Sequence, residues 1–228
     1  MKRKLTMKRT VIILVVIIAT GMFICCGQNN NNNNQNIICK KIDFNLLEEK
    51  AKKEEIRKGI FRKKYYEYTL EYEDVDSSWH KISGNKVDGF VEWTTPKLPL
   101  FYKVYSEYYG NGILKLTGYC IGKNMECKID IWEHFDKNGN KKKEIDEDTK
   151  YGAYNCSYVM VFLHAMKHIN IETGEGRESL VLAYDEKEKI WQVLITDKFD
   201  MITEYKMDGE TGDIILDTTY SCRKEIKK

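Results

Sequence analysis

The middle of the chain alternates apolar and polar residues, which is the pattern of a strand with one buried face. Between residues 66 and 72, three tyrosines and a leucine alternate with glutamates and a threonine. This period of two predicts a half-buried strand. The segments 89–93 and 98–105 are predicted as further strands, because both are rich in aromatic and aliphatic residues.

After residue 151 the apolar period lengthens to that of a helix. Apolar residues at i, i+3, i+4, i+7, i+8 and i+11 predict an amphipathic helix with one buried stripe. The stripe consists of Tyr158, Val161, Phe162, Ala165, Met166 and Ile169. Strands are predicted afterwards at 179–184, 190–196 and 201–207. We therefore expect an α+β chain: an antiparallel β-hairpin repeat region, then a small α+β domain with the helix packed on a three- to four-stranded antiparallel sheet.

The first 25 residues have the charge and hydropathy pattern of a secretory signal peptide. Five basic residues precede an apolar run over 11–24, which as a helix is too short to cross a bilayer comfortably. Either Met1 or Met7 could be the true start, since both leave a basic segment. The run ends in Cys25-Cys26, which resembles the lipobox of bacterial lipoproteins. An uncleaved anchor and an ordinary signal peptide are the alternatives.

The lipobox resemblance implies cleavage before Cys26 and acylation of its sulfur. The expected location is the bacterial cell envelope, with a lipid membrane bound through Cys26 and the protein facing the periplasm. The cell surface is the alternative, and inner and outer membrane are left open. Removing the five leader charges from the 37 basic residues leaves 32 against 35 acidic ones, a net charge of −3. A nucleic-acid partner is not expected, because no clustered basic field remains.

Residues 28–36 contain only Asn and Gln, so they cannot bury apolar surface and are expected to form a flexible tether. The following charged segment, 42–64, could be a short helix or a continuation of the tether. We expect a signal peptide over 1–25, a lipidated cysteine plus tether over 26–55, a β region over 56–150 and an α+β domain over 151–228.

Two similar motifs in the β region begin with paired aromatic residues and reach Asn-Gly dipeptides 27 residues apart. Asn-Gly tolerates positive φ and predicts hairpin turns. The residues are Tyr108-Tyr109, Asn111-Gly112, Gly118, Trp132 and Asn138-Gly139. They resemble MORN-like repeats found in bacterial toxin–antitoxin neighbourhoods, although Asp130 stands where that pattern has a glycine. The resemblance implies stacked β-hairpins that form a binding surface.

The C-terminal part resembles the PepSY module of secreted and membrane-attached bacterial proteins. The residues that carry this resemblance are Trp191, Val193, Asp208, Thr211 and Gly212. It implies a small α+β fold associated with inhibition or interaction rather than turnover.

Candidate catalytic and metal-binding motifs are incomplete. His164 and His168 have the i, i+4 spacing of a metal pair but lack the glutamate of a metalloprotease helix, so solvated surface histidines are expected. The loop after Asp136 places its glycine too early for a calcium loop and is expected to be a hairpin turn. Ser78 and His80 are close in sequence without a nucleophile-elbow motif, and no nucleophile is assigned. No metal or other cofactor is expected.

Five cysteines remain after processing, and an exported protein permits disulfides. Cys120 and Cys127 could face each other across a hairpin, but buried unpaired cysteines are equally compatible with the sequence. The remaining cysteines are Cys39, Cys156 and Cys222.

The β region is rich in aromatic residues, which suit a recognition surface. The expected surface comprises Tyr105, Tyr108, Tyr109, Tyr119 and Trp132; a tyrosine-rich core is the alternative.

The expected function is a non-enzymatic module that binds a protein partner, with immunity or inhibition against an envelope toxin as its most specific form. An envelope hydrolase with an unrecognised site and a structural envelope lipoprotein are the alternatives.

Overall fold

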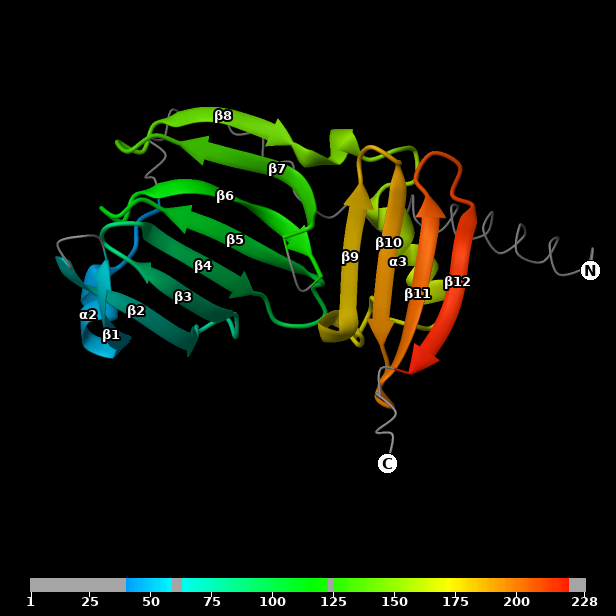
Figure 1. Cartoon of the computed structure of the whole chain (residues 1–228), viewed down its shortest axis with the longest axis horizontal. Coiled ribbons are helices and arrows are strands. Elements are labelled where there is room, and N and C mark those ends of the chain that lie inside the picture. The colour runs from blue at the N-terminus through cyan, green and yellow to red at the C-terminus, as the bar shows by residue number, and fades with distance from the viewer. Residues whose placement is uncertain (1–39, 59–62, 123–124, 222–228) are drawn as a thin grey trace, which may run out of the picture.

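The computed structural model describes residues 40–58, 63–122 and 125–221, which form two antiparallel sheets (Figure 1). The first sheet has eight strands that pair in chain order. They are β1 (Lys52–Lys58), β2 (Lys63–Glu73), β3 (Trp79–Asn85), β4 (Gly89–Thr95), β5 (Tyr102–Tyr108), β6 (Leu114–Ile121), β7 (Cys127–Phe135) and β8 (Lys141–Asp146).

The second sheet has four strands in the order β12-β11-β10-β9. They are β9 (Leu180–Asp185), β10 (Ile190–Thr196), β11 (Met201–Asp208) and β12 (Ile214–Ser221). The helices of the described part are α2 (Phe44–Lys50) and α3 (Cys156–Ala165), with the 3₁₀ turns η1 (Glu147–Lys150) and η2 (Arg177–Ser179). The α+β class built from antiparallel hairpins is confirmed.

The predicted strands at 66–72 and 89–93 lie within β2 and β4. The strand predicted over 98–105 begins only at Tyr102, because Pro99 has no backbone N–H to donate to a ladder. Both predicted Asn-Gly turns are confirmed, with φ of 80° at Gly112 and 88° at Gly139. Strands β1, β3, β8 and β12 lack a clear apolar period and were not predicted.

The tether predicted to reach residue 55 is wrong over residues 40–55, which are folded. Asp43 begins α2, because its Oδ1 accepts hydrogen bonds from the backbone N–H of Asn45 and Leu46. Leu47 is 1% exposed, which fixes the helix against the sheet. Strand β1 follows and pairs along its whole length with β2. The charged residues of this segment occupy the solvent side of a short helix and an edge strand.

One core lies between α2 and the face of the eight-stranded sheet that we call the α2 face. Strand residues reach it at every second position, as antiparallel pairing requires. Its buried members are Ile42, Leu47, Tyr68, Leu70, Ile82, Phe90, Tyr108, Leu114 and Phe135. The opposite side of this sheet is called the outer face below.

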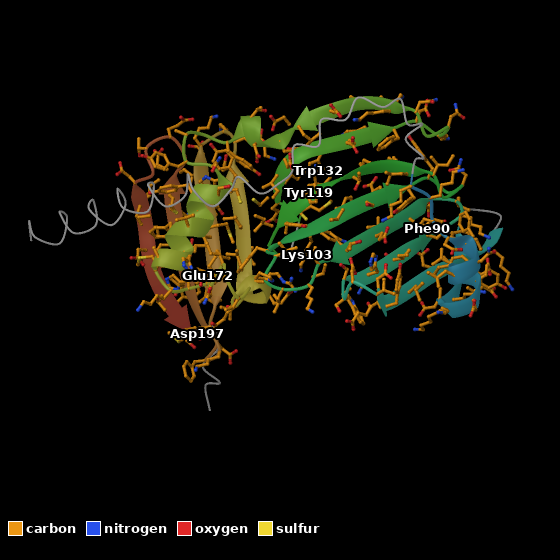
Figure 2. All side chains as sticks on the ribbon, turned by 180° about the vertical axis from the view of Figure 1, so that it is seen from behind. Phe90, Lys103, Tyr119, Trp132, Glu172 and Asp197 are labelled. Atoms are coloured by element: carbon orange, nitrogen blue, oxygen red, sulfur yellow. The ribbon has the colours of Figure 1, made fainter. Side chains whose placement is uncertain are left out.

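A second core lies between α3 and the four-stranded sheet, and the view from behind shows α3 in front of these strands (Figure 2). The helix buries Cys156, Val159, Met160 and Leu163, whereas Met166, a member of the predicted stripe, is 43% exposed. Of the predicted stripe, Ile169 is buried and Tyr158 and Phe162 pack against this core, whereas Ala165 and Met166 are exposed. The stripe was therefore wrong in part, because the run from Tyr158 to Leu163 is apolar all round and its period does not select one face. Strands supply the rest of this core, including Leu180, Leu182, Trp191, Val193, Ile195, Tyr205 and Met207.

The two sheets share the second core. Ile121 and Cys127 from the eight-stranded sheet, and Phe101 from the loop just before β5, pack among the residues of α3 and the four-stranded sheet. Arg177 adds a polar link, since its Nη1 donates to the carbonyl oxygens of Pro96 at 2.7 Å and Leu100 at 2.9 Å. No helix among the described residues is long and apolar enough to span a membrane.

Candidate functional site

A row of polar residues crosses the α2 face of the eight-stranded sheet. Glu92, Ser106, Thr117 and Glu133 are successive cross-strand partners on β4, β5, β6 and β7. Directly opposite residues of antiparallel strands point to the same side, so these four side chains share one face. Glu92 and Ser106 are 4% and 2% exposed. Buried polar residues need partners, and the partners of this row define the site.

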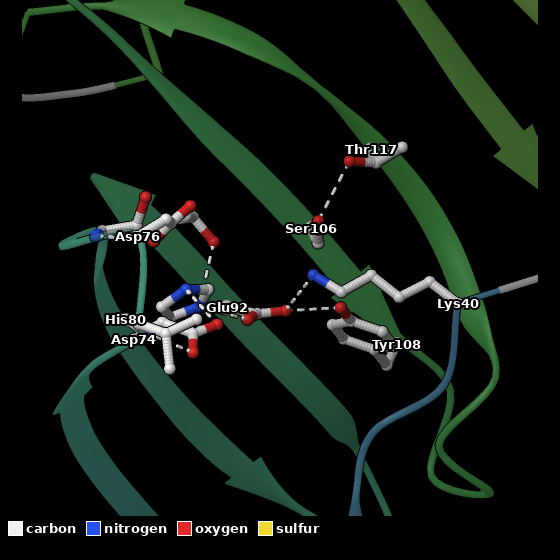
Figure 3. Close-up of polar contacts among 11 residues, drawn as sticks. Lys40, Asp74, Asp76, His80, Glu92, Ser106, Tyr108 and Thr117 are labelled. Atoms are coloured by element: carbon white, nitrogen blue, oxygen red, sulfur yellow. Dashed lines mark hydrogen bonds and ion pairs between the residues drawn. The ribbon is translucent and has the colours of Figure 1, made fainter. Parts of the chain in front are cut away.

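Glu92, at one end of this row, gathers several polar partners (Figure 3). Its Oε2 accepts hydrogen bonds from Lys40 Nζ at 2.8 Å and from the Tyr108 hydroxyl at 2.5 Å. Its Oε1 lies 2.8 Å from His80 Nδ1. Lys40 comes from the segment before α2, so residues from three separate parts of the chain meet at one carboxylate. We call Lys40, His80, Glu92 and Tyr108 the Glu92 cluster.

The electrostatics of the cluster favour an ionised Glu92. Burial by itself raises the pKa of the carboxyl, but the hydrogen bonds from Lys40 and Tyr108 outweigh it and lower the pKa below its ordinary value. The pKa of Tyr108 is strongly raised by burial and by the Glu92 charge, so its hydroxyl stays protonated and donates. The cluster therefore holds a buried carboxylate together with its donors. Removing one of these partners would lower the stability of the protein.

The imidazole of His80 is oriented on both sides. The ring of Tyr72 stacks on it, with centroids 4.8 Å apart and planes 10° from parallel. Its Nδ1 faces Glu92, and its Nε2 lies 3.9 Å from Asp74 Oδ2 near the surface. A histidine held by a carboxylate at Nδ1 has the arrangement of a general base.

The hydroxyl that lies against this histidine is that of Thr94, whose Oγ1 is 3.3 Å from Nδ1, the nitrogen that already faces Glu92. The Ser106 hydroxyl lies 2.9 Å from Thr117 Oγ1, and Thr117 donates to the Tyr105 carbonyl oxygen. Ser78, the serine weighed from the sequence, is buried, and its backbone N–H bonds Asp76 rather than His80. The Ser106 and Thr117 hydroxyls therefore satisfy each other and the backbone.

The predicted aromatic surface is wrong for three of its five residues. Tyr105, Tyr108 and Trp132 are between 2% and 5% exposed and belong to the interior. Tyr119 is 38% exposed and packs edge-on against Tyr102, and Tyr109 is half-buried with its hydroxyl on the Phe135 carbonyl. Large amphipathic rings fill a thin sheet-based core well, which is why the tyrosine-rich core prevails here.

Two tryptophans remain accessible on the outer face instead. Trp79 of β3 is 46% exposed, and Trp93 of β4 is half-buried against Tyr105, with ring centroids 4.9 Å apart. The two lie diagonally across neighbouring strands, since Trp79 pairs with Thr95 and Lys81 pairs with Trp93. The Lys81–Glu71 ion pair, 2.7 Å long, lies beside them. We call Trp79, Trp93, Lys81 and Glu71 the tryptophan patch.

A cavity of about 200 Å³ opens beyond the end of α3. Its lining includes His164 and His168, which were predicted to be solvated surface histidines. Both are half-buried: His168 Nε2 lies 2.7 Å from the Tyr205 hydroxyl, and His164 Nδ1 accepts from the Ile171 N–H. Because α3 ends at Ala165, His168 is outside the helix and the i, i+4 geometry does not form. No three His, Cys, Asp or Glu side chains of the described residues could hold a metal ion.

The sequence left open a Cys120–Cys127 bond across a hairpin and buried unpaired cysteines, and the three described cysteines are buried without that bond. Cys120 pairs across the strands with Lys128, and Cys127 pairs with Ile121, so the two cysteines point to opposite faces of the sheet. Cys127 lies against Cys156 instead. The hairpin pairing of Cys120 with Cys127 is therefore wrong. Cys26, Cys39 and Cys222 lie outside the described residues, as does the predicted lipidation site.

The sequence contained a weak signal for the Glu92 cluster. His80 and Glu92 both occupy strand positions that alternate with the opposite face of the sheet and point to its buried face. A charged group that is buried there needs a partner. The identity of that partner depended on the register of β3, β4 and β5 and on Lys40, none of which a sequence pattern fixes.

No protein-family model, no curated protein and no solved structure matches this chain. The residues and their geometry are therefore the basis for assigning a function.

Proposed function

We propose that the protein is a lipid-anchored, non-enzymatic module of the bacterial envelope that binds a protein partner through the tryptophan patch. The observation that carries the proposal is the exposure of Trp79 on an ordered strand beside Trp93 and the Lys81–Glu71 pair. Exposed tryptophans flanked by charges have the composition of binding hot spots, where aromatic residues supply most of the affinity. Immunity against, or inhibition of, an envelope toxin is the most specific form of this function.

The support from the fold is that the patch lies on a rigid platform. Trp93 contacts Tyr105, and Tyr105 stacks on Trp132 with ring centroids 6.0 Å apart. A preorganised aromatic surface loses little conformational entropy when a partner binds. Both tryptophans project from the outer face of the sheet, so they can meet a partner at the same time.

Contacts between neighbouring hairpins support the proposed relation to MORN-like repeats. The two Asn-Gly turns contact each other, because Asn111 Nδ2 donates to the Lys137 carbonyl at 3.3 Å. Just before these turns in each hairpin, the Tyr109 hydroxyl donates to the Phe135 carbonyl at 2.9 Å. Both contacts join one hairpin to the next, and hairpins stacked in this way support a repeat. For the C-terminal part, α3 on a four-stranded antiparallel sheet supports the PepSY-like relation.

Site-specific photo-crosslinking in cells tests the binding function. A photoreactive amino acid at position 79 of the full-length protein is expected to crosslink one defined protein. The same amino acid at position 199 is the matched control, because Phe199 is an exposed aromatic residue in a turn of the other sheet. Trp79→Ala is expected to weaken recovery of that protein at least tenfold, and Phe199→Ala to leave it unchanged. Equal crosslinking at both positions, or none at 79, would contradict the proposal.

The immunity form has its own test. Cells that express the product of a neighbouring toxin gene are expected to survive with the wild-type protein and to lose protection with Trp79→Ala. Protection that is unaffected by this variant would exclude the tryptophan patch from the function.

The anchor is tested by metabolic labelling with an alkyne fatty acid. Cys26→Ala is expected to abolish labelling and to release the protein from membranes. Cys25→Ala is the matched control and is expected to keep both properties, since the adjacent cysteine leaves with the leader. Labelling that survives Cys26→Ala would contradict the anchor.

An envelope hydrolase is the second candidate, and the His80–Glu92 pair is the observation that favours it. A panel of ester, phosphate, glycoside and peptide substrates would decide between the two. Turnover by the wild-type protein that is lost in His80→Asn, a variant that keeps a donor towards Glu92, would favour the hydrolase.

A further inference from the structure

Two buried cysteines from different parts of the fold lie side by side. Cys127 is the first residue of β7 and Cys156 is the first residue of α3. Their sulfurs are 3.4 Å apart, and the residues are 0% and 3% exposed. Small side-chain rotations can bring two sulfurs at this separation to the covalent distance of about 2.0 Å.

We propose that Cys127 and Cys156 form a disulfide bond in the exported protein. The bond would join the eight-stranded sheet to the helix of the second core. It rests on the export that the proposed function includes, because thiols stay reduced in most cytosols.

The register of the sheet excludes the nearest competitor among the described cysteines. Cys120 is buried beside Lys103 and its Sγ lies 3.7 Å from the Lys103 carbonyl oxygen. It projects from the opposite face of the β6–β7 hairpin to Cys127, as its pairing with Lys128 shows. A bond between Cys120 and Cys127 would require β6 or β7 to rotate so that its side chains point to the opposite face of the sheet.

The oxidation is a two-electron step that needs an oxidant. A disulfide-bearing oxidoreductase or small-molecule disulfide of the compartment serves as acceptor. The thiolate of one cysteine attacks that disulfide and releases one acceptor thiol. The second protein thiolate then attacks the mixed disulfide, releases the other acceptor thiol and leaves the Cys127–Cys156 bond, with two protons lost from the protein thiols.

The surroundings indicate when this step occurs. The hydrogen bond to Cys127 and burial both raise the pKa of the Cys156 thiol, and the Tyr151 hydroxyl lies 3.8 Å from the Cys127 sulfur. Thiols that are buried and protonated react slowly. The bond therefore forms while the chain folds in the envelope and is afterwards protected from reductants.

Peptide mapping of the native protein tests the proposal. The full-length protein is taken from the membrane fraction, denatured with N-ethylmaleimide present, digested and analysed by mass spectrometry. The expected result is a linked pair of peptides containing Cys127 and Cys156, with Cys120 alkylated. Alkylation of both Cys127 and Cys156, or a link from either to another cysteine, would overturn the proposal.

A second arm separates failure of the disulfide from failure of export. The purified protein is unfolded, reduced and refolded in an oxidising glutathione buffer, and mapped in the same way. If the native protein is reduced but the 127–156 link forms in this buffer, export is the part that failed. If the link forms in neither, the placement of the two cysteines is wrong.

Stability provides an independent readout. Reduction is expected to lower the melting temperature by about 5–10 °C in the wild type, because the bond closes a loop between residues 29 apart in sequence. Cys120→Ser is expected to show the same drop. Cys156→Ser is expected to start lower and to show no drop on reduction, and an equal drop in this variant would contradict the pairing.

Discussion

The indole ring of Trp132 lies directly on the backbone of Gly118. A Cβ atom on Gly118 would approach Trp132 ring atoms to 2.3–2.4 Å, far inside van der Waals contact. The ladder between β6 and β7 shifts register at this point, and Trp132 Nε1 donates to the neighbouring Tyr119 carbonyl at 3.0 Å. Lys128 covers the ring from above, with Nζ 4.3 Å from the ring centroid. The glycine is therefore needed so that the ring can close over the sheet.

Gly118→Ala is expected to destabilise the protein by about 2–3 kcal/mol. The new methyl group would clash with the Trp132 ring, and moving the ring out of its buried site also costs stability. Urea unfolding of the full-length protein measures the change. The control is the pair of variants Trp132→Phe and Gly118→Ala/Trp132→Phe. The double variant is expected to lose less than the sum of the two single losses, and strict additivity would show that the two residues do not interact.

Glu92→Gln is expected to lower the free energy of unfolding at pH 7 by about 1–3 kcal/mol, because it removes the buried charge that accepts hydrogen bonds from Lys40 and Tyr108. Glu71→Gln removes an exposed ion pair with Lys81 and is the matched control, with an expected loss below about 1 kcal/mol. Urea unfolding at neutral pH makes the comparison, and equal losses would contradict the role of the Glu92 cluster.

The same carboxyl predicts an acid dependence. Its folded-state pKa is lowered, so ionised Glu92 contributes stability that is fully present above the ordinary value of 4.5 and is lost as the pH falls through the lower folded-state pKa. The wild type is therefore expected to lose more stability than Glu92→Gln between pH 5 and acid conditions. Unfolding curves recorded over this range would refute this if the two proteins kept a constant difference.

Local patterns predicted the strands and turns that depend only on neighbouring residues. The alternation in β2, the apolar run in β10 and the glycines of the two Asn-Gly turns each determine their own conformation, and these predictions were confirmed. Gly118 and Trp132 were both singled out from the sequence as residues of the proposed repeat, but their contact was not foreseen. The face of a fully apolar segment, in contrast, depends on what packs against it, so α3 was assigned a stripe that is wrong in part.

The candidate sites were harder to predict because they depend on register and on distant segments. Lys40 reaches Glu92 across 52 residues, and Cys127 meets Cys156 only after the two sheets have docked. The buried state of Tyr105 and Tyr108 likewise follows from covering residues on other strands. No periodicity in a single segment contains this information.

The corrected face of α3 can be tested with two alanine variants. Leu163→Ala is expected to cost about 3 kcal/mol, since Leu163 is 0% exposed and its truncation leaves a cavity in the second core. Met166→Ala is the matched control at the end of the same helix and is expected to change stability by less than about 0.5 kcal/mol, because Met166 is 43% exposed. Thermal unfolding of both variants decides the point: a larger loss for Met166→Ala would restore the stripe predicted from the sequence.

Arg177 provides the last prediction, which concerns the connection between the two sheets. Its side chain is 12% exposed, and its Nη1 donates to the Pro96 and Leu100 carbonyls in the loop between β4 and β5. Arg177→Ala is expected to cost about 1–3 kcal/mol, because it leaves these acceptors without their donor. Hydrogen exchange of residues 96–102 is expected to become faster, since the loop would lose its contact with η2. Lys187→Ala, at a side chain that is 90% exposed, is the control and is expected to change neither quantity. If exchange in this loop stayed at the wild-type rate in Arg177→Ala, the shared apolar core alone would hold the two sheets together.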